Sequence, residues 1–163
     1  MRHSGMRSIS ELSALLLCLA LAPALWAADV PTPGAWRDTI ERISPAVVSI
    51  QVDGTRAFDT EWNESSQATG FVVDAERGLI LTNRHVVTSG PVRAVAILTN
   101  QEELELTPVY RDPVHDFGFY RYDPQSLKYI KPMALRLNPA GAQIGREIRV
   151  VGNDGGEQLS ILS

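Results

Sequence analysis

The chain reads Leu79-Ile80-Leu81-Thr82-Asn83-Arg84-His85-Val86-Val87 where an apolar strand gives way to a polar turn. A second stretch, Asp112-Pro113-Val114-His115-Asp116-Phe117-Gly118-Phe119, carries an acid at the start of another strand. A histidine and an aspartate at two strand ends, in this order, are typical of the first two members of a His-Asp-Ser triad. The sequence therefore predicts a fold that brings His85 and Asp116 together.

His85 and Asp116 have the chemistry that such a triad needs. A serine hydroxyl is a poor nucleophile at neutral pH, so an imidazole, whose pKa is ordinarily about 6.5, must accept its proton as attack begins. A buried carboxylate on the other ring nitrogen fixes the tautomer and stabilises the imidazolium that forms. We expect the strand before His85 to fix its backbone, and Phe117 and Phe119 to bury one face of the strand that follows Asp116.

His115 is a rival for the role of base, because it precedes Asp116 directly. Successive residues of an extended strand point to opposite faces, so we expect His115 to lie outside the site that holds Asp116. A metal site formed by His85, His115 and Asp116 is a second alternative. The chain lacks the closely spaced ligand pair of most zinc signatures, so we do not expect these residues to bind a metal ion.

The first residues resemble a secretory leader. Two arginines precede an apolar run from Leu12 to Leu25, which is shorter than the roughly 20 residues of a membrane-spanning helix. We expect residues 1–27 to be a signal peptide, residues 28–35 a linker and residues 36–163 one globular domain. This organisation predicts a periplasmic or secreted location, or a membrane-anchored protein if the leader stays uncleaved.

The charge of the chain bears on its partners, and its cysteine content bears on how the domain is stabilised. The chain has 15 basic and 19 acidic residues and a net charge of −4. An acidic balance without a basic stripe argues against nucleic acid as a partner. The only cysteine, Cys18, lies in the apolar run. The domain is therefore expected to depend on its apolar core and not on disulfides.

The pattern after the leader is mostly that of β-strands, preceded by a short amphipathic helix at Trp36–Ile43. Leu104 and Leu106 alternate with glutamates, which predicts a half-buried strand, whereas Val72-Val73 and Leu79-Ile80-Leu81 are continuous apolar runs expected in strands buried on both faces. Gly, Pro, Asn and Asp punctuate the runs at a spacing typical of a barrel or sandwich. The expected strands are Ala46–Val52, Ala68–Asp74, Leu79–Thr82, Val92–Leu98, Glu103–Tyr110, Phe117–Tyr122, Met133–Leu137 and Glu147–Gly152, with a long surface loop at Gly54–Gln67.

Several of these segments together resemble one family of proteases. Ser66–Asp74 and Gly78–Val87 are similar to the HtrA/DegP family of trypsin-like serine proteases, whose pattern is a glycine-led strand, a turn, an apolar strand and Thr-Asn-x-His-Val. Tyr110–Phe119 and Gly145–Glu157 resemble more narrowly the branch that includes the fungal nuclear pro-apoptotic protease with several PDZ domains. The resemblance covers about Trp36 to Ser163.

The resemblance implies an all-β, chymotrypsin-like pair of antiparallel barrels, with the first barrel present and the second truncated within residues 36–163. It implies that His85 is the general base and Asp116 the orienting acid of a serine endopeptidase that acts on unfolded or misfolded polypeptides without a cofactor. It leaves a homo-oligomer open for the full-length protein. Ser160 and Ser163 lie in an alternating pattern without the glycines of an oxyanion hole, so the nucleophile is expected beyond the end of this sequence.

A second class of function stays open, namely a non-catalytic binding module built on the same barrel. The two classes differ in one sequence feature. Only the enzyme requires a Gly-x-Ser-Gly-type segment after Ser163.

Overall fold

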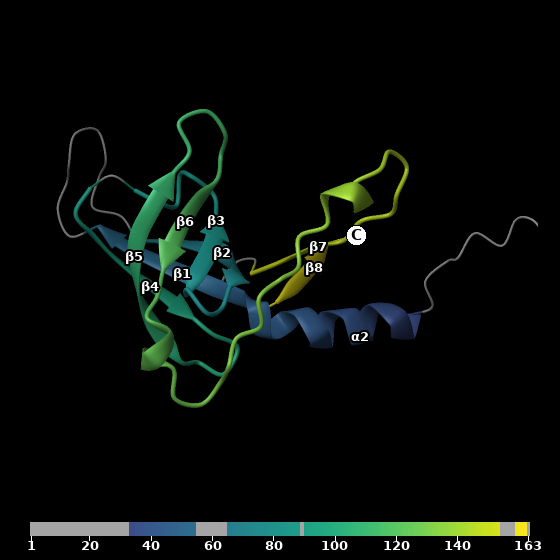
Figure 1. Ribbon diagram of the computed structural model, residues 1–163, viewed down its shortest axis with the longest axis horizontal. Helices are drawn as coiled ribbons and strands as arrows, with labels where there is room; N and C mark the ends of the chain where they lie inside the picture. Colours follow the sequence, from purple (N-terminus) through teal and green to yellow (C-terminus); the bar gives the residue numbers. More distant parts are fainter. Residues whose placement is uncertain (1–32, 55–64, 89, 154–158, 163) are drawn as a thin grey trace, which may run out of the picture. The chain divides into compact units, whose positions relative to one another are not determined.

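The computed structural model describes residues 33–54, 65–88, 90–153 and 159–162. In this part of the chain the secondary structure is mostly β (Figure 1). The elements in chain order are α2 (Pro33–Ile43), η1 (Ser44–Ala46), β1 (Val47–Gly54), β2 (Ser65–Asp74), β3 (Leu79–Thr82), β4 (Val92–Ile97), β5 (Glu103–Arg111), β6 (Gly118–Arg121), η2 (Pro124–Ser126), η3 (Pro139–Gly141), β7 (Val150–Gly152) and β8 (Ser160–Leu162).

Six strands close into one antiparallel barrel in the order β1-β2-β3-β6-β5-β4. Strands β3 and β6, which are far apart in the sequence, lie side by side in Figure 1 and pair from Leu79↔Arg121 to Thr82↔Gly118. A closed barrel leaves none of its strands with an unpaired edge, which removes a route to edge-to-edge aggregation. The predicted all-β barrel is thus confirmed for residues 47–121.

The interior of the barrel is filled by apolar side chains that alternate along the strands. Ile50, Ile80 and Tyr120 are fully buried, at 0% exposure. Gly70 of β2 lets this core close, because a Cβ on it would lie 2.6 Å from Ile50 Cδ1 and 2.7 Å from Ile80 Cγ2. Ordinary carbon contacts lie at about 3.5–4.0 Å. Hence no side chain larger than that of glycine fits at position 70 unless its neighbours move.

The continuous apolar runs do not mark strands that are buried on both faces. Val72 and Ile80 are fully buried, while Val73, Leu79 and Leu81 are only partly buried. A strand of a small antiparallel barrel presents alternate residues to the single core, so a run of apolar residues still buries only every second one. By contrast, the predicted half-buried strand of residues 103–110 is confirmed, since its leucines are buried and its glutamates exposed.

Two predicted strands near the end of the chain differ from the structure. Residues 133–137 form no strand, and a single backbone hydrogen bond, from Leu135 N–H to the Val72 carbonyl at 2.8 Å, ties them to β2. Strand β7 begins at Val150 and not at Glu147, because β8 pairs with it only from Val150 to Gly152. In both places an apolar pattern lacks a neighbouring strand within the described residues, and a strand requires such a partner.

The helix α2 begins at Pro33, inside the predicted linker 28–35. Proline is tolerated in the first turn of a helix because its missing N–H has no partner there. The predicted signal peptide, residues 1–27, lies outside the described residues, as does most of the predicted loop 54–67. No helix in the part of the chain that the structure describes is long and apolar enough to cross a membrane.

Candidate active site

His85 lies in a tight turn that follows β3 directly. Val86 N–H donates to the Asn83 carbonyl at 3.2 Å, and Val87 N–H donates to the Arg84 carbonyl at 3.1 Å. These two successive hydrogen bonds close turns that both include His85. The backbone that carries the imidazole is thereby held by local hydrogen bonds.

Two buried hydroxyl groups anchor this turn to the barrel. Thr82, only 5% exposed, donates its hydroxyl to the Thr69 carbonyl at 2.9 Å and so holds the last residue of β3 against β2. Tyr120 of β6 donates its hydroxyl to the Val86 carbonyl at 3.0 Å, directly after His85. Burial raises the pKa of Tyr120 to about 12, so its hydroxyl remains a donor at any ordinary pH.

Asp116 lies in the compact loop that joins β5 to β6. The loop is closed by two backbone bonds, from Asp112 N–H to the Phe117 carbonyl at 3.0 Å and from Phe117 N–H to the His115 carbonyl at 2.9 Å. Because Gly118 pairs with Thr82, the start of β6 lies beside the end of β3. The two loops that carry the predicted pair therefore emerge at the same end of two neighbouring strands.

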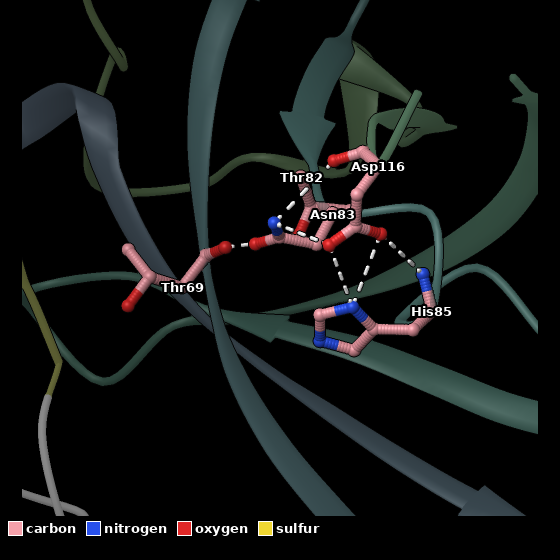
Figure 2. Close-up of polar contacts among 5 residues, drawn as sticks. All are labelled: Thr69, Thr82, Asn83, His85 and Asp116. Carbon is pink, nitrogen blue, oxygen red and sulfur yellow. Dashed lines mark hydrogen bonds and ion pairs between the residues drawn. The ribbon is translucent and has the colours of Figure 1, made fainter. Parts of the chain in front are cut away.

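The structure brings His85 and Asp116 into direct contact, as Figure 2 shows. His85 Nδ1 lies 2.9 Å from Asp116 Oδ2 and 3.1 Å from Oδ1, and the His85 backbone N–H donates to Oδ1 at 3.2 Å. Asn83 adds a further donor, its amide Nδ2 lying 3.1 Å from Oδ2. The second ring nitrogen of His85 points away from the carboxylate. This arrangement can hold one ring tautomer and leaves Nε2 free to exchange a proton with another group.

Hydrogen bonding favours the ionised form of Asp116. Partial burial acts to raise its pKa, but the His85 backbone N–H, the Asn83 amide and the His85 ring together outweigh this, so the pKa lies below its ordinary value. The Asp116 side chain is 47% exposed, which is less burial than we expected for the orienting carboxylate. It lies at the rim of the barrel, where hydrogen-bond donors and not burial hold it in place.

His115 lies outside the pair. Its Nδ1 is 3.3 Å from Asp112 Oδ1, and its side chain is 75% exposed. We expected strand alternation to separate the His115 side chain from that of Asp116. The two residues lie in a loop and not in a strand, so alternation does not explain the separation. The alternative metal site finds no support within the described residues, where no three metal-ligating side chains cluster.

Two polar residues at the site were missed from the sequence. Asn83 contacts Asp116 directly, and Asp112 organises the loop that carries Asp116. Asp112 precedes a proline, which is a signal for an aspartate that accepts hydrogen bonds from its own loop. That signal could have identified Asp112, whereas the direction of the Asn83 amide depends on the position of β6.

The model of the trypsin-like peptidase domain matches residues 68–163. The chain belongs to the trypsin-like peptidase family. It is 56% identical over 151 residues to the pro-apoptotic serine protease nma111 of Aspergillus terreus, covering 93% of this chain and 14% of that protein. It is 55% identical over 141 residues to the protein of the same name from Yarrowia lipolytica, covering 86% of this chain and 14% of that protein. The chain thus spans about a seventh of the length of these relatives.

Solved structures share the fold of this chain. The HtrA-type protease AlgW with a tripeptide superposes with a TM-score of 0.62 at 24% identity, over 77% of this chain and 37% of that one. A protease from M. tuberculosis in its active form superposes with a TM-score of 0.60 at 23% identity, over 75% of this chain and 48% of that one. The predicted relationship to trypsin-like serine proteases is confirmed by the family model and the curated relatives. The solved structures share the predicted chymotrypsin-like fold of the barrel.

The predicted periplasmic or secreted location is wrong. The chain is 55–56% identical to two fungal proteins named as pro-apoptotic serine proteases, and this similarity contradicts the predicted location. The location was predicted from an apolar run rich in alanine and leucine after two arginines, and such a composition alone does not fix the location of a protein.

Proposed function

We propose that this chain supplies the base and the orienting acid of a serine endopeptidase. His85 is the general base and Asp116 the acid that orients it. The observation that carries this assignment is the contact between His85 Nδ1 and the Asp116 carboxylate at 2.9 Å, with Nε2 directed away from it. Because one ring nitrogen binds the carboxylate and the other does not, Nε2 is available to a nucleophile.

The chemistry follows from the division of roles between the two ring nitrogens. Nδ1 carries a proton and donates it in a hydrogen bond to Asp116, so Nε2 presents its lone pair to a serine hydroxyl and accepts the proton as the oxygen attacks a peptide carbonyl. The imidazolium that forms is stabilised by the ionised carboxylate. The Asn83 amide and the His85 backbone N–H keep that carboxylate ionised and stationary. His85 then returns the proton to the leaving amine.

We place the nucleophilic serine outside residues 36–163. Ser160 lies in strand β8, and the sequence around it lacks the glycines that open an oxyanion hole. In this proposal residues 36–163 form the first barrel and the start of the second, β7 and β8 being the beginning of the latter. A hydrogen bond from the Asn153 backbone N–H to the side-chain hydroxyl oxygen of Thr69, at 2.8 Å, joins this segment to the first barrel.

The proposed substrates are unfolded or misfolded polypeptides. Their support is the similarity to HtrA-type proteases, one of which, AlgW, is described both with a tripeptide and with a decapeptide. The proposed reaction needs only side-chain and backbone groups, since proton transfer and an oxyanion hole supply the catalysis. Residues 1–163 expressed alone should show no turnover of casein, because the proposed nucleophile lies outside residues 36–163.

A chimera tests the proposal. In the A. terreus relative, the segment that matches this chain is replaced by the corresponding residues of this chain, and hydrolysis of casein is measured. We expect the chimera to be active, and Asp116→Asn to reduce kcat by about 10⁴-fold because an amide stabilises the wrong tautomer. His85→Ala should be comparably damaging, and the double variant little worse, since triad members act as a unit.

His115→Ala is the matched control, because it removes an imidazole from the residue directly before Asp116. Its activity should stay within about tenfold of the parent chimera. A chimera that loses activity with His115→Ala and keeps it with His85→Ala would show that the base is misassigned. A folded chimera with no activity, and with casein bound, would favour the non-catalytic binding module.

A further inference from the structure

Asp112 is a second heavily hydrogen-bonded carboxylate at this end of the barrel. It is 9% exposed, and its oxygens accept from Val114 N–H at 2.9 Å, from His115 N–H at 2.6 Å and from the Tyr110 hydroxyl at 2.9 Å. The ring of His115 makes an additional contact, its Nδ1 lying 3.3 Å from Asp112 Oδ1. These donors all come from the loop itself or from the end of β5, so the carboxylate forms the centre of the turn.

The loop that Asp112 organises is the one that presents Asp116. Asp112 N–H closes the loop onto the Phe117 carbonyl, and Asp112 Oδ1 holds the backbone N–H of His115, the residue before Asp116. The loop also lies against the turn of the base, because Arg84 Nη1 donates to the Pro113 carbonyl at 3.4 Å. A change in the centre of the turn would therefore move the Asp116 backbone relative to His85.

Close packing at Gly118 restricts the conformations that the C-terminal end of the 112–117 loop can adopt. Gly118 follows Asp116 by two residues, and a Cβ on it would lie 2.7 Å from Val87 Cγ2 and 3.0 Å from the Tyr110 carbonyl oxygen. The C-terminal end of the loop is thus fixed by β6 and by the residues after His85. The remaining degree of freedom is the backbone from residue 113 to residue 116, which is where the carboxylate of Asp112 binds.

We propose that Asp112 is a positioning residue that holds the 112–117 loop in the one conformation that presents the Asp116 carboxylate to His85 Nδ1. It acts through the loop backbone and does not touch the reacting atoms. This inference rests on the proposed function, since it concerns the same pair. Backbone donors from His115 and Val114 also lower the pKa of Asp112 to about 2, so its acceptors are present throughout the neutral and mildly acidic range.

The experiment uses the whole chain, labelled with ¹⁵N-histidine, and needs no peptidase activity. A ring N–H that donates to a carboxylate gives a strongly downfield proton resonance, and the signal of His85 is assigned by its loss in His85→Ala. Its rate of exchange with water is then compared in Asp112→Ala and Asp112→Asn. Asp123→Ala is the matched control, because Asp123 accepts a backbone N–H, that of Gln125 at 2.9 Å, in a loop away from the site.

In Asp112→Ala we expect the His85 resonance to disappear or to exchange at least about tenfold faster, as local opening of the loop requires. Asp112→Asn keeps one carbonyl oxygen for the two backbone donors and should retain the resonance, and Asp123→Ala should leave it unchanged. If the alanine variant does not fold, Asp112→Ser, whose hydroxyl binds such donors more weakly, should still accelerate exchange about threefold or more.

A folded alanine or serine variant with the exchange rate of the parent would overturn the inference alone. Absence of the resonance from the parent chain would instead contradict the His85–Asp116 pair, and with it both the proposed function and the role of Asp112. An equal loss in Asp123→Ala would show that the effect reflects general loosening of the fold. That result would also count against a positioning role for Asp112.

Discussion

Replacing Gly70 with alanine should destabilise the barrel measurably. The new methyl group would lie 2.6 Å from Ile50 Cδ1 and 2.7 Å from Ile80 Cγ2, about 1 Å inside ordinary carbon contact. Both neighbours are fully buried, so they can move aside only into a densely packed core. Overpacking of this kind costs about 1–3 kcal/mol, which at roughly 4 °C per kcal/mol lowers the melting temperature by about 4–12 °C.

A second substitution separates the steric cause from a general effect of losing glycine. Ile50→Val removes the Cδ1 atom that the new methyl group strikes, at a cost of about 1 kcal/mol on its own. In Gly70→Ala/Ile50→Val the two costs should not add, and the free energy of unfolding should recover by about 1 kcal/mol relative to their sum. Val95→Ala, which truncates a buried valine outside the core cluster, should combine additively with Gly70→Ala.

The assay is urea denaturation of the four proteins of each cycle, followed by circular dichroism at one temperature. Additive behaviour of the Gly70 and Ile50 changes would refute the reasoning. A Gly70→Ala variant as stable as the parent would also refute it, because the core would then accommodate a methyl group that the distances of 2.6 and 2.7 Å exclude.

Three further predictions concern substitutions elsewhere in the described part of the chain and at Asp112. Tyr120→Phe removes the hydroxyl that donates to the Val86 carbonyl and should lower the free energy of unfolding by about 1 kcal/mol in urea denaturation. Gly78→Ala, at a φ of +68° where a Cβ would strike a backbone carbonyl, should cost more in the same assay than Gly145→Ala, at a φ of +83° with nothing near it. The lowered pKa of Asp112 means that its contribution to stability is complete above about pH 4 and is lost as pH falls through about 2, so Asp112→Asn should flatten the acid limb of melting temperature against pH.

The sequence predicted most of the barrel because each strand there satisfies its local pattern and also has a partner. Leu104 and Leu106 alternate with glutamates, and that alternation survives in the structure as buried against exposed residues. The same reasoning failed for residues 133–137, whose apolar residues are as regular as those of a strand. No described strand pairs with them, and sequence periodicity carries no information about whether a partner is present.

At the site, the pair could be predicted and its supports could not. His85 and Asp116 were identified from their places at two strand ends and from the family pattern. The roles of Asn83 and Asp112 depend on where the loop after β5 meets the turn after β3, which is a property of the barrel and not of either segment. His115 illustrates the same limit, because its separation from Asp116 was expected from a strand that proved to be a loop.

The pairing of β3 with β6 also makes the spacing of the two side chains independent of the chain between them. Thr82 and Gly118 are neighbours across the barrel, whatever the length of the β4–β5 hairpin that separates them in sequence. The tip of that hairpin, at Asn100 and Gln101, can therefore serve as an insertion point. Each doubling of a flexible loop costs only about 0.6 kcal/mol in closure entropy. A recognition peptide, an affinity tag or a fluorescent reporter placed at this tip would leave the geometry of the proposed pair intact.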